Sequence, residues 1–273
     1  MSSTDFHLGP TPTPAAGALA GKGIVVTRPM WQALPLAQAL GEAGAVPIVF
    51  PAIVIEPNPA VNLLDVQMRL SQCSRAFFVS ANAVREGLMG LATFPSNVRA
   101  YGPGPGTAQA LQACGATTVC TPTTSFDTQG LLAMPELQQL AGDRVMVFTG
   151  LVAGASGKGE LAAALHARGA DVEVVACYNR RPPDTSAQGV EEMCTAGRVH
   201  AVVLTSAEGI ANFWNCLSPS GQATMQTIPA FVPHPNVAVA ARAKGFATVN
   251  DCGAGDAALL DALTNHFSKE HSA

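Results

Sequence analysis

The sequence predicts an α/β protein of parallel strands covered by helices, organised as two domains of similar topology. Short apolar strands alternate with Ala- and Leu-rich helical segments along the chain, which is typical of parallel βα units buried on both faces. The same series of segments occurs twice. The length of 273 residues allows one large domain or two of ordinary size, and the repeat favours two.

The predicted strands are short runs rich in Val, Ile and Phe, bounded by Gly, Pro or polar residues. Helices are predicted between them from amphipathic segments such as "LAQALGEAG" (36–44) and "LAAALHARG" (161–169). In chain order, the predicted strands cover residues 23–27, 46–50, 76–80, 98–102, 117–121, 145–149, 172–178, 201–205, 229–233 and 247–251.

The second half of the chain repeats the order of the first. The segment "GKGIVVTRP" (21–29) corresponds to "GDRVMVFTG" (142–150), and "AFFVSANAV" (76–84) corresponds to "VVLTSAEGI" (202–210). This repeat places Ser80 and Ser206 at equivalent positions in two similar domains.

Two long extended segments, residues 46–57 and 172–183, connect the opening β-α-β of each copy to its serine-bearing unit. Paired extended crossings suit a two-stranded hinge, with the middle of the chain inserted into an outer domain. The pattern by itself leaves open whether the middle is inserted or the two domains simply follow one another.

The composition is that of a well-buried globule, with 48% hydrophobic and 12% charged residues. The net charge is −4 and Lys plus Arg total 15, which disfavours nucleic acid or an anionic membrane surface as a partner. An acidic ligand would have to be bound by local groups rather than by a global field.

The cysteines and histidines do not predict a metal site. The seven cysteines are scattered without C-x-x-C spacing and are interpreted as small buried hydrophobes in a reducing cytosol. The histidines lack paired metal-ligand spacing. Residues 1–20 have no basic n-region and contain three prolines, so a disordered tail and a cytoplasmic location are expected. No run approaches the roughly 20 apolar residues of a membrane helix.

The segment "LTSAEG" (204–209) allows three interpretations of Ser206. A nucleophile elbow requires G-x-S-x-G, because the sharp turn leaves no room for side chains, and Thr205 and Gly209 break that spacing. A helix N-cap is favoured, since Thr205 or Ser206 can accept from free amides and Glu208 lies near the positive end of the helix dipole. Binding of an anion at the same helix end is compatible with a cap.

Ligands of open parallel sheets bind outside the carboxyl ends of the strands, where helix N-termini suit carboxylates or phosphates. The repeat predicts such ends in both domains, and two of them facing one cleft would bind a ligand with several anionic groups. The candidate residues are Thr27 and Arg28; Ser80, Ala81 and Asn82; Gly104 to Thr107, with Gly106; Thr205, Ser206 and Ala207; and His234 to Val237.

Two glycine-rich segments fail as nucleotide-binding motifs. In "YGPGPGTA" (101–108), Thr107 stands where G-x-G-x-x-G needs its third glycine, and the prolines remove amide donors. It is interpreted as a tight turn that leaves the Gly106 and Thr107 amides free. In "GASGKGE" (154–160), Gly159 replaces the Ser or Thr of a phosphate loop.

The segment "CYNRRPP" (177–183) ends an apolar strand with a tyrosine and two arginines. It is either a hinge strand with solvated arginines, or it brings Tyr178 to an interdomain cleft as a proton donor while an arginine holds a carboxylate. Periodicity does not choose between these alternatives.

Taken together, these motifs resemble the uroporphyrinogen-III synthase family. The motifs of this family are individually weak, but their joint order is specific, and the resemblance covers roughly residues 21–265. The motifs are "VTRPxxQ" (26–32), "PIVFPAIVI" (47–55), "FVSANAV" (78–84), "GPGTA" (104–108), "CYNRRPP" (177–183), "TSAEG" (205–209), "FVPHP" (231–235) and "GDAALLDAL" (255–263).

The resemblance implies two doubly wound α/β domains joined by a two-stranded ladder, one domain inserted in the other. It places residues 21–50 with 181–273 in one domain and about 51–178 in the second. The implied substrate is hydroxymethylbilane, whose carboxylates match the anion-binding ends. No cofactor or metal is implied, and a monomer is expected.

The implied reaction is loss of the ring A hydroxyl as water, followed by attack of ring D on the resulting azafulvenium, rearrangement through a spiro intermediate and ring closure. The family tyrosine that assists the leaving group corresponds to Tyr178. A phenol with a pKa near 10 stays protonated at neutral pH. The resemblance places Arg28, Ser80, Thr107, Ser206 and His234 at the cleft.

The segment after residue 149 departs from the family pattern. The family often has arginines where Thr149 and Gly159 stand, so contacts from the turn at 150–160 are not carried over. Two other classes of function compete with a cyclising lyase: a non-catalytic two-domain binding protein for an anionic small molecule, and a nucleotide-dependent transferase. The failed glycine motifs disfavour the transferase.

Overall fold

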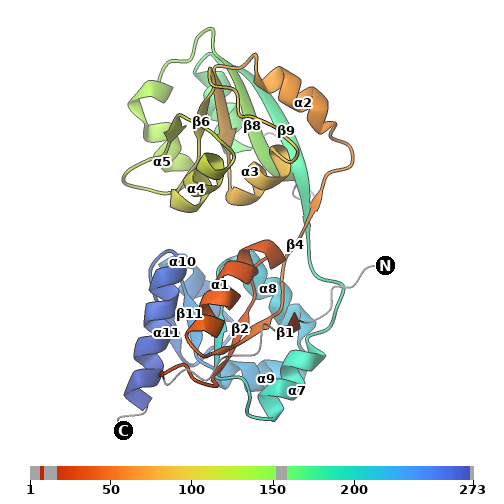
Figure 1. The fold of residues 1–273 in the computed structure, drawn as a ribbon, viewed down its shortest axis with the longest axis vertical. Helices are drawn as coiled ribbons and strands as arrows, with labels where there is room; N and C mark the ends of the chain where they lie inside the picture. Colours follow the sequence, from red (N-terminus) through yellow and green to blue (C-terminus); the bar gives the residue numbers. More distant parts are fainter. Residues whose placement is uncertain (1–6, 9–16, 152–158, 271–273) are drawn as a thin grey trace. The chain divides into compact units, whose positions relative to one another are not determined.

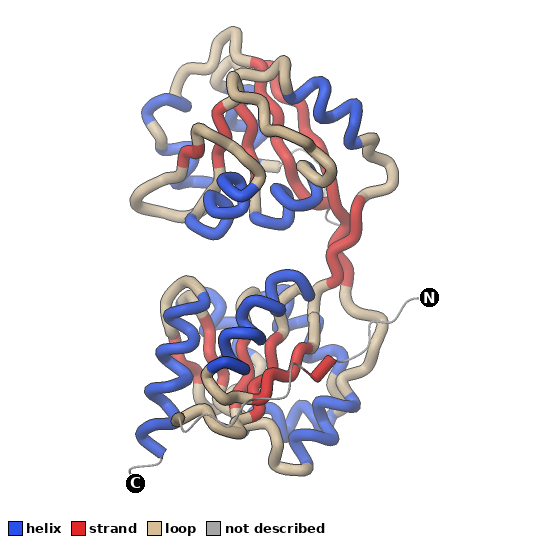
Figure 2. Tube along the Cα trace, in the orientation of Figure 1, coloured by secondary structure: helices blue, strands red, loops and turns tan. Residues whose placement is uncertain are grey.

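The computed structural model describes residues 7–8, 17–151 and 159–270. The chain divides into two compact units, shown in Figure 1. The split unit consists of Met1–Val54 with Arg181–Ala273, and the central unit is Ile55–Arg180. Each unit contains one sheet with helices packed around it (Figure 2), so the prediction of an α/β fold with parallel sheets is confirmed.

The split unit is built on a sheet in the order β1-β3-β2-β10-β11-β12. All its pairings are parallel except that of β1 with β3. The strands are β1 (His7–Leu8), β2 (Gly23–Val26), β3 (Val46–Val49), β10 (Ala201–Val203), β11 (Ala230–Val232) and β12 (Val249–Asp251); the helices are α1 (Met30–Glu42), α7 (Gln188–Thr195), α8 (Ala207–Cys216), α9 (Pro219–Thr227), α10 (Pro235–Ala243) and α11 (Asp256–Glu270).

The central unit has a second sheet in the order β4-β9-β8-β5-β6-β7, in which β9, β8, β5, β6 and β7 run parallel. The strands are β4 (Val54–Pro57), β5 (Arg75–Phe78), β6 (Arg99–Tyr101), β7 (Val119–Cys120), β8 (Arg144–Leu151) and β9 (Asp171–Arg181); the helices are α2 (Leu63–Leu70), α3 (Ala81–Gly87), α4 (Pro105–Ala113), α5 (Thr128–Ala133), the 3₁₀-helix η1 (Pro135–Leu137) and α6 (Glu160–Ala167).

Both faces of each sheet are buried, which explains why the strands are apolar throughout rather than alternating. In the central unit, Phe78 stacks on Phe148 on one face with ring centroids 4.5 Å apart, while Phe77 stacks on Tyr101 on the other at 4.6 Å. Successive strand residues point to opposite faces, so the neighbouring phenylalanines supply two separate cores.

The prediction of a disordered tail over residues 1–20 is wrong for part of that range. Leu19 is 1% exposed and packs in the same core as Ile24 and Leu40. His7 pairs with Val49 in the β1–β3 ladder. The three prolines of this segment all precede Leu19, which fills a gap beside the first strand, where burial is favourable. Residues 1–6 and 9–16 lie outside the described ranges.

Each parallel sheet contains a point at which the chain reverses its direction of winding. In the split unit β2 is followed by β3 on one side, whereas β10 lies on the other; in the central unit β5 leads to β6 and β7 on one side, and β8 lies on the other. Crevices outside the carboxyl ends of such strand pairs are where open α/β sheets bind ligands. The residues after β2, β10 and β5, and those at the end of β8, therefore mark the candidate sites.

The close packing of α3 on the central sheet depends on Gly87. A Cβ atom at this position would lie 2.5 Å from Cδ1 of Phe148, so Gly87→Ala overpacks the core. We expect this variant to lose about 1–3 kcal/mol of unfolding free energy in urea titrations.

Gly41 in α1 is the matched control, because a Cβ there meets nothing within 4 Å. Gly41→Ala is expected to gain up to about 1 kcal/mol, since alanine is the better helix former. Equal stability of the two variants would contradict the close approach at Gly87.

Candidate functional site

The structure gathers the predicted site residues at the carboxyl ends of the parallel strands, in two groups. In the central unit, Ser80 follows β5, Gly106 and Thr107 lie in the first turn of α4 after β6, and Tyr178 lies near the end of β9. In the split unit, Arg28 follows β2, Ser206 follows β10 and His234 follows β11. Each group lies at the carboxyl ends of the parallel strands of one sheet, on both sides of the reversal point of that sheet.

Tyr178 is the most buried of the predicted polar site residues, with 2% of its surface exposed. Its phenol oxygen lies 3.2 Å from Oγ of Ser80. Burial raises the pKa of Tyr178, and this is opposed by the hydrogen bond from Ser80 and by the positive charge of Arg180. The phenol is therefore fully protonated at neutral pH, and the Ser80 hydroxyl holds it in place.

A β-bulge in β9 turns the side chain of Tyr178 into this core. Thr149 pairs with Ala176 and Gly150 pairs with Tyr178, so Cys177 is an extra residue in β9. Without the irregularity, consecutive residues would face opposite sides of the sheet. Instead Cys177 and Tyr178 are both buried in the core that contains Phe148.

Cys177 is a structural residue. Its thiol donates to the backbone carbonyls of Thr149 at 3.4 Å and Ala83 at 3.7 Å. Burial raises the pKa of Cys177 to about 12, so the reactive thiolate is absent at neutral pH. The thiol thereby links β9 to β8 and to α3 beside the tyrosine.

The absence of a side chain at Gly150 leaves room for the Tyr178 ring. A Cβ atom on Gly150 would lie 2.6 Å from Cε2 and Cζ of the ring and 3.0 Å from its hydroxyl. The sequence analysis did not predict this residue: the repeat pairs Gly150 with Pro29, and the ring beside it comes from a residue 28 positions later.

Ser80 and Ser206 are helix N-caps of the same geometry. Ser80 Oγ accepts from the Ala83 amide at 3.2 Å and Ser206 Oγ accepts from the Gly209 amide at 3.0 Å. The cap interpretation of Ser206 is therefore confirmed. The hydrogen bond given for Ser206 Oγ is thus a cap contact rather than a contact with a general base. Thr205 is half-buried before the cap, and Ala207 is exposed as the first residue of α8.

Ala81 and Asn82 form the half-buried first turn of α3. At α4, Gly106 is exposed and Thr107 is 7% exposed. The Thr107 amide donates to the carbonyl of Gly104 at 3.1 Å, so the expectation that this amide is free is wrong. The cause is local: the turn that starts α4 closes on its own N-cap carbonyl, and a threonine side chain packed against Gly102 holds it there.

In the split unit Arg28 forms an ion pair with Asp256, in the first turn of α11. The Arg28 side chain is 13% exposed and that of Asp256 is 41% exposed, so the arginine is anchored under a more accessible carboxylate. The sequence analysis did not predict Asp256 as the partner of Arg28, because the two residues are far apart in the chain. The Thr27 hydroxyl donates a hydrogen bond to the Val203 carbonyl at 2.9 Å.

His234 caps α10 through its ring. Nδ1 accepts from the Asn236 amide at 3.2 Å, so the ring proton of the neutral imidazole is on Nε2, which can donate outward. Further along β9, Arg181 pairs with Asp184 at 2.6 Å. The turn at 150–160 falls largely on residues 152–158, outside the described ranges.

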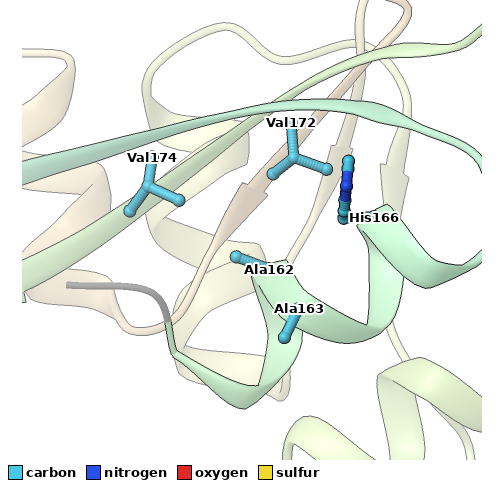
Figure 3. Close-up of a pocket in the computed structure, with 5 residues that line it drawn as sticks. All are labelled: Ala162, Ala163, His166, Val172 and Val174. Carbon is cyan, nitrogen blue, oxygen red and sulfur yellow. The ribbon is translucent and has the colours of Figure 1, made fainter. Parts of the chain in front are cut away.

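A cavity of about 300 Å³ lies between α6 and β9, shown in Figure 3. It is lined by Ala162, Ala163, His166, Val172 and Val174. Val172 and Val174 belong to the core on the face opposite that of Tyr178. The cavity is thus separate from the edge that carries the predicted site.

Within the described ranges, no cluster of three or more His, Cys, Asp or Glu side chains is arranged to hold a metal ion. The same ranges contain no helix with the length and hydropathy needed to span a bilayer.

The two mainly parallel sheets have capped helix ends at the carboxyl ends of their strands, and the central unit adds the buried Tyr178; together they define a two-unit α/β protein. Comparison with known proteins makes the class specific: the chain belongs to the uroporphyrinogen-III synthase family, whose model "Uroporphyrinogen-III synthase HemD" matches residues 35–251.

Named relatives agree with this assignment. A uroporphyrinogen-III synthase of Proteus mirabilis is 32% identical over 58% of this chain and 79% of the relative. That of Escherichia coli K12 is 29% identical over 71% of this chain and 79% of the relative. A crystal structure of a mutant uroporphyrinogen III synthase from Thermus thermophilus has the same fold, with a TM-score of 0.56 and 18% identity over 91% of this chain and 99% of the other.

The contact between Gly150 and Tyr178 predicts a change in titration. In the wild type, burial raises the pKa of Tyr178 above its ordinary value near 10. A Cβ at position 150 would overlap the ring, so in Gly150→Ala we expect the ring to leave its buried position and this pKa to fall back towards 10. An NMR pH titration of the tyrosine rings measures it.

The other tyrosine, Tyr101, lies on the opposite face and serves as an internal control whose titration should not move. An unchanged Tyr178 titration in Gly150→Ala would mean that the ring does not depend on the glycine.

Proposed function

We propose that the protein is a cofactor-free uroporphyrinogen-III synthase, which cyclises hydroxymethylbilane to uroporphyrinogen III with loss of water and inversion of ring D. The observation that carries this proposal is the buried Tyr178 phenol, bonded to Ser80 at the sheet edge, in a chain of this family. The protein acts as a cytoplasmic monomer.

Tyr178 assists departure of the ring A hydroxyl. The phenol proton passes to the leaving oxygen as the carbon–oxygen bond breaks, which releases water and leaves an azafulvenium cation and a phenolate. The Ser80 hydroxyl and the positive charge of Arg180 both favour the phenolate, while burial keeps the proton in place until the substrate takes it. The substituted carbon of ring D then attacks the cation to form the spiro intermediate. The bond from that carbon to its original bridging carbon breaks, the bridging carbon bonds to the free carbon of ring D, and the proton lost on ring closure restores the phenol.

The electron-rich substrate supplies much of this reactivity, so the protein chiefly has to fold the chain of pyrroles into a reactive geometry. Its carboxylates are held by Arg28, by the amides at the N-termini of α8 and α10, and by Nε2 of His234 in the split unit. The first turns of α3 and α4 serve the central unit. Such contacts are local, which suits a chain with net charge −4.

The domains expected from the sequence, residues 21–50 with 181–273 and 51–178, compare with the units Met1–Val54 with Arg181–Ala273 and Ile55–Arg180. Tyr178 lies on β9, close to the point at which the chain passes from one unit to the other.

The assay for the function supplies hydroxymethylbilane and identifies the porphyrin isomer after oxidation. We expect isomer III in excess from the wild type. Isomer I alone, which forms without catalysis, would instead favour a non-catalytic binding protein.

The role of Tyr178 predicts that Tyr178→Phe stays folded and loses about 10²- to 10⁴-fold in kcat, because a general acid contributes this much. Tyr101→Phe is the matched control: it removes the hydroxyl of the other buried tyrosine in the unit, which bonds to Arg75 on the opposite face. Wild-type activity in Tyr178→Phe would remove the proton-donor role.

The cap role of Ser206 predicts that Ser206→Ala raises KM a few-fold and leaves kcat near the wild-type value, because the helix end is loosened but no bond-making group is lost. Ser218, which caps α9 by accepting from the Gly221 amide at 3.1 Å, is the control cap. Ser218→Ala should lower stability without raising KM. Complete inactivation of a folded Ser206→Ala enzyme would restore the nucleophile interpretation.

A further inference from the structure

Among the Phe, Tyr and Trp side chains that the structure describes, Phe126 is the one that is mostly exposed, at 57%. The others are buried or half-buried. Single exposed aliphatic side chains are ordinary on a protein surface, but a large exposed ring costs free energy and calls for an explanation from its surroundings.

The loop that carries Phe126 is rigidly held on both sides of the ring. Ser125 Oγ donates to Oδ2 of Asp127 at 2.7 Å, and Oδ1 of Asp127 accepts from the Gly130 amide at 2.8 Å, which caps α5. Gly130 is so close to this loop that a Cβ atom on it would lie 1.8 Å from the Ser125 carbonyl oxygen. Since both neighbours of Phe126 are fixed, its exposed position is a built feature of the loop.

The ring lies at the carboxyl edge of the central sheet, the same edge as the Ser80–Tyr178 pair. A Cβ atom on Gly104 would meet Cβ, Cγ and Cδ1 of Phe126 at 3.3 to 3.9 Å, so the phenylalanine lies against the turn that follows β6. From β9 to β6 the sheet order is β9-β8-β5-β6. Three strand spacings separate β6 from the strand of Tyr178 by about 14 Å.

We propose that Phe126 is a substrate-binding residue that packs against a pyrrole ring of the substrate other than the one at the leaving hydroxyl. This inference rests on the proposed function. A linear tetrapyrrole is a chain of flat, electron-rich rings with carboxylate side chains, so it needs apolar contacts as well as cations and amides. A preorganised aromatic side chain suits such a ring, because aromatic pairs interact beyond the area that they bury.

The distance of Phe126 from Tyr178 determines how its loss should appear in the kinetics. A contact with a ring remote from the bond being broken is present both in the bound substrate and in the transition state. Removal of such uniform binding raises KM and leaves kcat unchanged. Loss of the proton donor Tyr178 should instead lower kcat.

The test measures kcat, KM for hydroxymethylbilane and the isomer ratio for Phe126→Ala, Phe126→Leu and Phe126→Tyr. We expect Phe126→Ala to raise KM about five- to tenfold with kcat within about twofold of the wild type. Phe126→Leu should recover only part of the loss, and Phe126→Tyr most of it, because it keeps the ring.

Met68→Ala is the matched control, since Met68 is an apolar side chain of the same unit, 62% exposed on α2. It should keep the wild-type KM, and thermal unfolding should be unchanged in both Met68→Ala and Phe126→Ala.

An unchanged KM in Phe126→Ala, or equal KM values for leucine and phenylalanine, would overturn the ring contact. A loss of kcat accompanied by a lowered Tm would show instead that the ring only covers Gly104. Isomer I alone from the wild type would overturn the proposed function itself. If the wild type makes isomer III and Phe126→Ala keeps the wild-type KM, only the role of Phe126 is overturned.

Discussion

The position of Tyr178 depends on one steric constraint, the close approach of its ring to the backbone of Gly150. The bulge at Cys177 turns two consecutive side chains of β9 into one core, and the missing side chain at position 150 makes room for the larger of them. The hydroxyl then meets Ser80, which is itself fixed as the cap of α3. The bulge at Cys177, the glycine at position 150 and the cap Ser80 thus together position the phenol hydroxyl of Tyr178.

The same capping serine occurs in both units with different consequences. Ser80 and Ser206 each accept a hydrogen bond from the backbone amide three residues further along. Ser80 also bonds to the Tyr178 phenol. The split unit offers an anchored arginine and a capping histidine instead. The two units thus share the capping serine and differ in the side chains around it: a buried phenol in the central unit, and an arginine and a histidine in the split unit.

Much of this arrangement could be predicted from sequence, because it depends on local patterns. The apolar runs specify the strands, and the serines after "VVLT" and "FFV" specify the caps. What could not be predicted depends on close contacts between distant segments. Gly150 under a tyrosine 28 positions later, Asp256 beside Arg28, Leu19 in the first core and Phe126 against Gly104 leave no periodic trace. The Thr107 amide was misjudged because a turn can close on its own carbonyl.

The sequence by itself determined the fold class, the repeated units and the residue types at the ends of the strands, since hydrophobic periodicity and capping act over a few residues. The tertiary structure decided which of those residues meet. A one-residue slip between β8 and β9 reverses the face to which a side chain points, and no pattern within β9 reveals it. The pairing of Tyr178 with Ser80 therefore follows from how two strands align and how closely a helix approaches them.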